Sequence, residues 1–111
     1  MPLIPEPLHH RLIQLRRVLH EYPELSGQEA NTAAVICKFL DGLAIKYRAH
    51  VAGHGVVAEI PGRAGVPCVV LRADMDALPI QEDTGLEFAS VHDGIMHACG
   101  HDGHTTMLLG A

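Results

Sequence analysis

The sequence predicts an α/β fold, with two helices first and then a mixed sheet that has helices on its faces. Apolar residues recur at helical spacing over the first 44 positions and at strand spacing after about position 55. At 111 residues the chain has the length of one domain. Apolar residues make up 48% and charged residues 19%, a composition that can form a buried core.

The first predicted helix covers residues 8–21. Its apolar residues recur every three or four positions, at Leu8, Leu12, Leu15, Leu19 and Tyr22. Polar and basic residues lie between them, so the helix is amphipathic. Pro23 follows directly, and we expect the helix to end there because proline lacks the backbone N–H that would continue it.

The second predicted helix begins at the sequence Ser26-Gly27-Gln28-Glu29 and continues to about Ala44. These four residues fit a capping box, in which the serine hydroxyl and the glutamate carboxylate each accept a hydrogen bond from a free backbone N–H. One apolar face follows, formed by Ala33, Ile36, Cys37, Leu40 and Leu43.

Two strands are predicted next. Residues 56–60 alternate in the manner of a strand, and 61–65 have the proline and glycine content of a turn. Residues 68–71 are continuously apolar, which is typical of a central strand covered on both faces. We therefore expect 56–60 and 68–71 to pair as a hairpin.

The last 33 residues are predicted as a long loop at 79–95, with a short extended piece at 86–89, and a helix from residue 105 to the end. That helix stops before three turns and without a capping signal. We interpret residues 1–111 as the front part of a larger domain, because the predicted sheet has few strands.

Composition excludes several classes of protein. Eight basic residues stand against thirteen acidic ones, and the basic residues form no stripe, so we expect no nucleic-acid binding. No signal peptide and no apolar run of the length of a membrane span is present. Three cysteines cannot pair completely within one chain. We expect a soluble cytoplasmic protein with reduced thiols and no membrane partner.

The densest group of metal-ligand residue types occupies positions 97–104, which hold three histidines, one cysteine and one aspartate. Thiolate and imidazole are good ligands for zinc-like ions. In an extended segment Cys99 and His101 would point to the same side and reach one ion. Asp102 either orients a metal-bound imidazole or caps the terminal helix, and for that residue alone we favour the cap. The alternative for the group is a polar loop with solvated histidines.

A second acidic pair, Asp74 and Asp76, follows the predicted strand at 68–71. The carboxyl end of a strand is where open α/β sheets usually place their chemistry. These carboxylates can help hold a cation or a metal-binding imidazole, or they can simply be residues of an exposed turn. Glu82, Asp83 and Glu87 are interpreted as a solvated loop, and the role of His20 is left open.

Three strings of this sequence together resemble one known family. They are HEYPELS at 20–26, LRADMDALP at 71–79 and MHACGHDGH at 96–104. They resemble the M20 family of metallopeptidases, and within it the amidohydrolase branch that includes N-acyl-amino-acid amidohydrolases, hippurate hydrolases and auxin-conjugate hydrolases. The motifs occur in the family's order, and the resemblance covers residues 11–111 almost continuously.

The resemblance implies a co-catalytic divalent-metal site in an α/β catalytic domain, with zinc or manganese expected and cobalt or nickel as alternatives. It implies that Cys99 and His101 are metal ligands and that Asp76 is the catalytic acid that steadies the site. Asp74 stands where the wider family has a metal-binding histidine, so its role, like those of Asp102 and His104, is left open.

The resemblance also implies a small-molecule N-acyl amino acid as substrate. The family's inserted domain often mediates dimerisation, so we expect a homo-oligomer. The family's Glu-Glu pair and two further histidine ligands come after the 111 residues. We therefore expect residues 1–111 to be the N-terminal segment of the catalytic domain without the inserted dimerisation domain, and to be inactive alone.

Two alternatives remain open for the chain itself. One is a non-catalytic fragment that self-associates, because an unpaired strand edge favours pairing with another chain. The other is a plain metal-binding module that uses His97, Cys99, His101 and His104 as a self-contained site.

Overall fold

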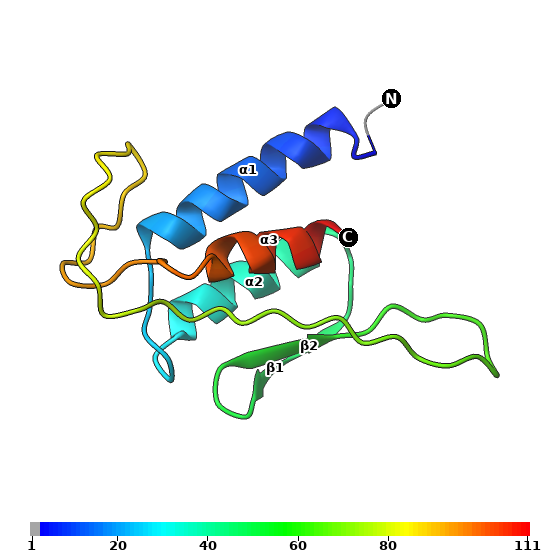
Figure 1. The fold of residues 1–111 in the computed structure, drawn as a ribbon. Coiled ribbons are helices and arrows are strands. Elements are labelled where there is room, and N and C mark those ends of the chain that lie inside the picture. Colours follow the sequence, from blue (N-terminus) through cyan, green and yellow to red (C-terminus); the bar gives the residue numbers. More distant parts are fainter. Residues whose placement is uncertain (1–2) are drawn as a thin grey trace.

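The computed structural model describes residues 3–111, and Met1 and Pro2 lie outside the described residues. The chain forms three helices and a two-stranded sheet (Figure 1). In order these are α1 (Glu6–Glu21), α2 (Ala30–Gly42), β1 (Tyr47–Val51), β2 (Gly55–Ala58) and α3 (His101–Gly110). The predicted α/β class is confirmed, but the sheet in the described residues is antiparallel rather than mixed.

Helix α1 confirms the first predicted helix and adds two residues at its start. Pro7 occupies the first turn, where the missing N–H of proline costs no helical hydrogen bond. Leucines 12, 15 and 19 are buried and form the core with Phe39 of α2. The apolar spacing therefore correctly predicts which face of α1 is buried.

Helix α2 begins at Ala30, and its predicted capping box is wrong. Ser26 does not cap the helix, because the left-handed Gly27 (φ +82°) turns the chain between Ser26 and the first helical residue. Glu24 takes over the capping role from outside the helix. Its carboxylate accepts hydrogen bonds from the Thr32 hydroxyl (2.7 Å) and from the backbone N–H groups of Thr32 and Asn31.

The hairpin pairs β2 with the strand before it, so the predicted pairing of 56–60 with 68–71 is wrong. Strands β1 and β2 are antiparallel, and Tyr47 lies opposite Ala58. The connection between them is shorter, because Ala52 and Gly53 both adopt positive φ and reverse the chain at once. Only 56–58 of the predicted strand 56–60 belong to β2.

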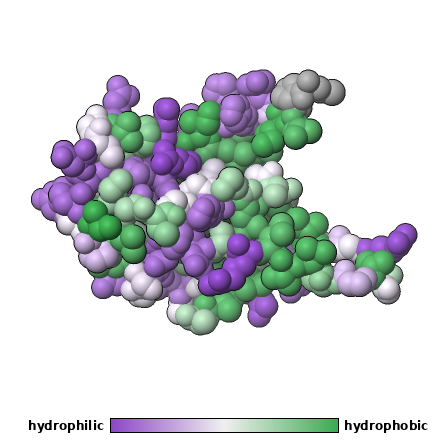
Figure 2. Space-filling view, in the orientation of Figure 1, coloured by the Kyte–Doolittle hydropathy of each residue, from purple (hydrophilic) through white to green (hydrophobic). Residues whose placement is uncertain are grey.

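The predicted central strand at 68–71 is wrong for the described residues. This segment is an unpaired stretch of chain (Figure 1), and Val69 and Val70 are 81% and 83% exposed. A strand needs a neighbour for its backbone hydrogen bonds, and no described segment pairs with this one. The space-filling view shows extensive hydrophobic surface in green (Figure 2).

The loop at 79–95 contains no helix or strand, as predicted, and an isolated bridge between Leu78 and Met96 closes it. The expected extended piece at 86–89 is instead a turn. Helix α3 begins at His101 rather than at residue 105, and it packs against α1. Among the described residues no helix is long and apolar enough to cross a membrane.

Candidate metal centre

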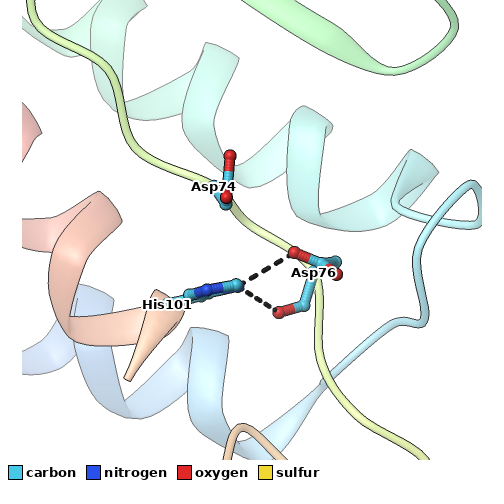
Figure 3. A group of neighbouring side chains, drawn as sticks. All are labelled: Asp74, Asp76 and His101. Atoms are coloured by element: carbon cyan, nitrogen blue, oxygen red, sulfur yellow. Dashed lines mark hydrogen bonds and ion pairs between the residues drawn. The ribbon is translucent and has the colours of Figure 1, made fainter. Parts of the chain in front are cut away.

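Three of the predicted site residues lie together at the start of α3. Asp74, Asp76 and His101 each offer one ligand atom, and these atoms all lie within 4.8 Å of one another (Figure 3). The two aspartates belong to the extended segment that leads to residue 78, and His101 is the first residue of α3. Asp74 is exposed, whereas Asp76 and His101 are half-buried.

The His101 ring is held in one orientation by Asp76. Nδ1 of His101 lies 2.9 Å from the Asp76 carboxylate and 3.0 Å from the Asp76 carbonyl oxygen. With both oxygens as acceptors, Nδ1 carries the proton and donates, which leaves Nε2 as the free ring nitrogen. A carboxylate behind an imidazole fixes its tautomer and strengthens it as a metal ligand.

Asp74 is held by one contact of its carboxylate and one of its backbone carbonyl. Its carboxylate lies 2.6 Å from Nη2 of Arg72, and its carbonyl oxygen accepts a hydrogen bond from the Thr105 hydroxyl (3.0 Å). The Thr105 contact connects the aspartate segment to the second turn of α3, so the three residues of the group are carried by two segments that are bonded to each other.

Cys99 is exposed and lies outside the group formed by Asp74, Asp76 and His101. The extended geometry assumed for positions 99–101 is wrong, because Gly100 is left-handed (φ +83°) and His101 is already helical. Metal binding by Cys99 stays a prediction. A thiol, an imidazole and carboxylates are nevertheless a donor set that fits a divalent transition metal.

His104 lies beside His101, with 5.8 Å between the ring centroids. Its ring also lies near Gly100, where a Cβ atom would come within 3.5 Å of Nε2 of His104. His104 is exposed and lies outside the Asp74–Asp76–His101 group.

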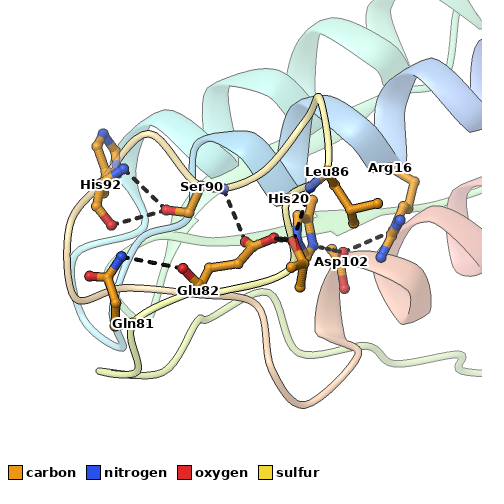
Figure 4. A network of polar contacts seen from close by, with 9 residues as sticks. Arg16, His20, Gln81, Glu82, Leu86, Ser90, His92 and Asp102 are labelled. Carbon is orange, nitrogen blue, oxygen red and sulfur yellow. Dashed lines mark hydrogen bonds and ion pairs between the residues drawn. The ribbon is translucent and has the colours of Figure 1, made fainter.

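Asp102 does not cap α3, so the interpretation that we favoured for this residue is wrong. The N-cap is Gly100, and the Asp102 carboxylate is buried against α1, 2.9 Å from Nε of Arg16 and 2.8 Å from Nδ1 of His20 (Figure 4). Burial alone raises the pKa of Asp102, but the hydrogen bond from His20 and the charge of Arg16 outweigh it. The pKa of Asp102 is lowered.

The Glu82 side chain is buried although the residue as a whole is half-buried, so its interpretation as part of a solvated loop is wrong. Its side chain is 2% exposed, and its carboxylate lies 2.9 Å from Nε2 of His20. The Ser90 N–H (3.0 Å) and the Thr84 hydroxyl also donate to it. Burial raises its pKa, but these hydrogen bonds prevail and the pKa of Glu82 is lowered.

His97 is a second buried histidine. It is 5% exposed, and neither of its ring nitrogens has a hydrogen-bond partner among the described residues. Burial lowers its pKa, because the charged imidazolium is disfavoured away from water, although the negative charge of Asp102 opposes this effect.

Comparison with known proteins shows similarity to one peptidase family. Residues 70–111, which include all three members of the Asp74–Asp76–His101 group, match the model for peptidase family M20/M25/M40. The resemblance to the M20 family is thereby confirmed over residues 70–111.

Two relatives are described as a deacetylase and as a hydrolase. The chain is 55% identical over 104 residues to N-acetyl-L-cysteine deacetylase of Bacillus subtilis. This match covers 94% of this chain and 25% of the deacetylase. The chain is 53% identical over 100 residues to IAA-amino acid hydrolase ILR1-like 2 of Arabidopsis thaliana, covering 90% of this chain and 23% of the relative.

A solved structure has the same fold over this stretch. The crystal structure of the Bacillus subtilis YXEP protein, described as a dinuclear metal binding peptidase from the M20 family, superposes with a TM-score of 0.89 at 50% identity. The match covers 95% of this chain and 30% of that one. The chain therefore spans about a quarter of the length of the relatives that it matches.

Proposed function

We propose that this chain supplies part of a divalent-metal site that hydrolyses the amide bond of N-acylated amino acids. The observation that supports it is the His101 ring, oriented by Asp76 with Nε2 free, beside Asp74. The similarity to N-acetyl-L-cysteine deacetylase supports the substrate class. In this proposal residues 1–111 are the N-terminal segment of a catalytic domain, and the enzyme is cytoplasmic and homo-oligomeric.

The proposed role of Cys99 rests on the family resemblance, and those of the other residues also draw on their positions. Cys99 and His101 hold the ion, Asp76 orients the imidazole, and Asp74 with His104 borders the site. When bound, a divalent ion lowers the pKa of its water to about 7 and polarises the carbonyl that is attacked. Zinc or manganese suits the nitrogen, oxygen and sulfur donors, and cobalt or nickel can replace them.

The same residues explain why the 111-residue chain is expected to be a weak catalyst. Two protein ligands are fewer than the three of a catalytic zinc site. A glutamate that would take the proton from the attacking water is absent from the Asp74–Asp76–His101 group. We therefore infer that the chain binds metal weakly and hydrolyses little by itself.

A metal titration tests the site. Cobalt, zinc and manganese binding is measured for the chain and for the variants Cys99→Ala and Cys68→Ala. Both cysteines are exposed, so the second variant is a matched control. We expect weak binding that Cys99→Ala reduces and Cys68→Ala leaves unchanged. Equal binding by all three proteins would contradict the role of Cys99.

A chimera tests the reaction. The matching quarter of N-acetyl-L-cysteine deacetylase is replaced by this chain, and release of acetate from N-acetylcysteine is measured. We expect the chimera to be active and its Asp76→Asn variant to lose most activity. A chimera that folds and binds metal but hydrolyses no N-acyl amino acid would refute the proposed reaction.

One observation favours a second candidate, a fragment that self-associates. Val69, Val70 and Leu71 are exposed on an unpaired stretch, and such a stretch can pair with another chain. Sedimentation over a range of concentrations distinguishes this candidate. Association that the substitution Val70→Lys abolishes would favour it, and a monomer at all concentrations would exclude it.

A further inference from the structure

A network of four ionisable side chains connects three parts of the chain that are distant in sequence (Figure 4), and all of them except that of Arg16 are buried. Arg16 and His20 come from α1, Glu82 from the loop at 79–95, and Asp102 from the first turn of α3. Its contacts are Arg16 to Asp102 (2.9 Å), His20 to Asp102 (2.8 Å) and His20 to Glu82 (2.9 Å).

His20 is the centre of this network. Its side chain is 3% exposed, and each of its two ring nitrogens faces a carboxylate oxygen. A carboxylate only accepts hydrogen bonds, so the ring satisfies both partners when both nitrogens carry a proton. The Phe88 ring packs edge-on against it, with 5.7 Å between centroids. Replacing His20 by an apolar residue would leave two buried carboxylates short of a donor, which is strongly unfavourable.

The network reaches the candidate metal centre through one peptide bond. Asp102 follows His101, and the two side chains are bonded to different parts of the chain: His101 to Asp76 and Asp102 to α1. Gly100 offers no side-chain cap to α3. The first turn of α3 is therefore anchored on one side by His101 and on the other by Asp102, and Asp102 is held by His20 and Arg16.

We propose that His20 is a positioning residue for the His101 ring, acting through Asp102. Without His20 the Asp102 carboxylate loses one of its two α1 partners, and the first turn of α3 can shift relative to Asp76. Such a shift would weaken the contact between Asp76 and His101, and loss of a partner bonded directly to a metal-binding imidazole typically lowers metal affinity by about 10-fold to 100-fold. The metal part of this inference rests on the proposed function, whereas the orientation of His101 can be measured without metal.

The experiment uses the whole chain and the variants His20→Leu and His20→Gln, with His9→Gln as control. His9 lies on the same helix and is exposed. The first readout is the pair of ring 15N chemical shifts of His101 at one fixed pH without metal. We expect the parent and the control to show the form with the proton on Nδ1, and His20→Leu to show shifts averaged over both forms. The amide of His20→Gln can still donate to Asp102, so this variant is expected to restore part of the parent pattern.

Cobalt affinity, measured from the visible absorption of the bound ion, is the second readout. We expect a loss of about 10-fold or more in His20→Leu and a smaller loss in His20→Gln. Urea unfolding confirms that each protein is folded during the measurement. A lower stability with unchanged His101 shifts and unchanged cobalt affinity is the result of a merely structural role, and it would overturn the proposal.

Two further outcomes remain decisive. If His20→Leu does not fold, Asp102→Asn and His20→Gln replace it, and parent-like His101 shifts in both would overturn the proposal. If the parent binds no cobalt, the proposed metal site fails, while the metal-free shifts of His101 still decide the role of His20.

Discussion

Glu82→Gln separates what the structure predicts from what the sequence alone predicts. The substitution keeps the size of the side chain and removes its charge. Glu82 receives hydrogen bonds from His20, Ser90 and Thr84 while 2% exposed, whereas Glu87 in the same loop is exposed. Both glutamates belong to the loop predicted to be solvated, so Glu87→Gln is a matched control.

The magnitude follows from the contacts of the carboxylate. A hydrogen bond to a charged group contributes about 1.5–3 kcal/mol, and the Gln amide oxygen still accepts from the Ser90 N–H. We expect Glu82→Gln to lower the free energy of unfolding by about 1.5–3 kcal/mol at pH 7. We expect Glu87→Gln to change it by less than about 0.5 kcal/mol, as is usual for surface positions.

The pH dependence of this difference has a definite sign. The pKa of Glu82 is lowered in the folded protein from its ordinary value of 4.5, so the unfolded chain takes up a proton first. The stabilisation by the carboxylate is present above about pH 4.5 and is lost as the pH falls through the folded value. Protonated glutamate and glutamine are then similar, and the difference between parent and Glu82→Gln should shrink.

Urea unfolding followed by circular dichroism at pH 7 and at pH 4 measures both effects. Glu87→Gln reports any general effect of removing one negative charge from this loop. If Glu82→Gln and Glu87→Gln were equally stable at pH 7, or if the loss in Glu82→Gln grew on acidification, the assignment of Glu82 to the buried network would be refuted.

Three other substitutions test the fold and the site. Asp76→Asn should weaken cobalt binding by about 10-fold or more, because the metal-binding imidazole of His101 loses its carboxylate partner. Asp93 is exposed, so Asp93→Asn is the control and should bind cobalt like the parent. Equal cobalt affinities of the two variants would contradict the role of Asp76. Leu19→Ala should cost about 2–5 kcal/mol in urea unfolding, because Leu19 is 3% exposed, and should clearly exceed Ile13→Ala on the outer side of α1. Glu24→Ala should cost about 0.5–2 kcal/mol by removing the cap of α2, and a thermal midpoint equal to that of the parent would argue against the cap.

Local patterns in the sequence correctly predicted that three helices form, although they misplaced the starts of α2 and α3. The apolar spacing of α1 reports directly which residues face the core, because a helix forms its backbone hydrogen bonds within itself. The strand predicted at 68–71 is wrong, since a strand depends on a neighbour that its own sequence does not specify. The pairing of β2 with β1 was missed for the same reason.

The candidate site was predictable in part. Asp74, Asp76 and His101 stood out as residues of the right type near one another in two short motifs, and the fold brings them together. The partnership of His20 with Glu82 and Asp102 has no local signal, because its members are 62 and 82 positions apart. The sequence draws attention to His20 only through the HEYPELS string, which is one of the three strings that resemble the M20 family.

Amide hydrogen exchange in the unpaired stretch at 68–71 can report whether another segment pairs with it. Its backbone N–H groups have no backbone acceptor within the described chain, so their hydrogens should exchange with deuterated solvent as fast as those of an open peptide. The amides in the middle of α1 are bonded along the helix and should exchange slowly. Slower exchange at 68–71 would therefore show, residue by residue, that another strand has paired with this stretch.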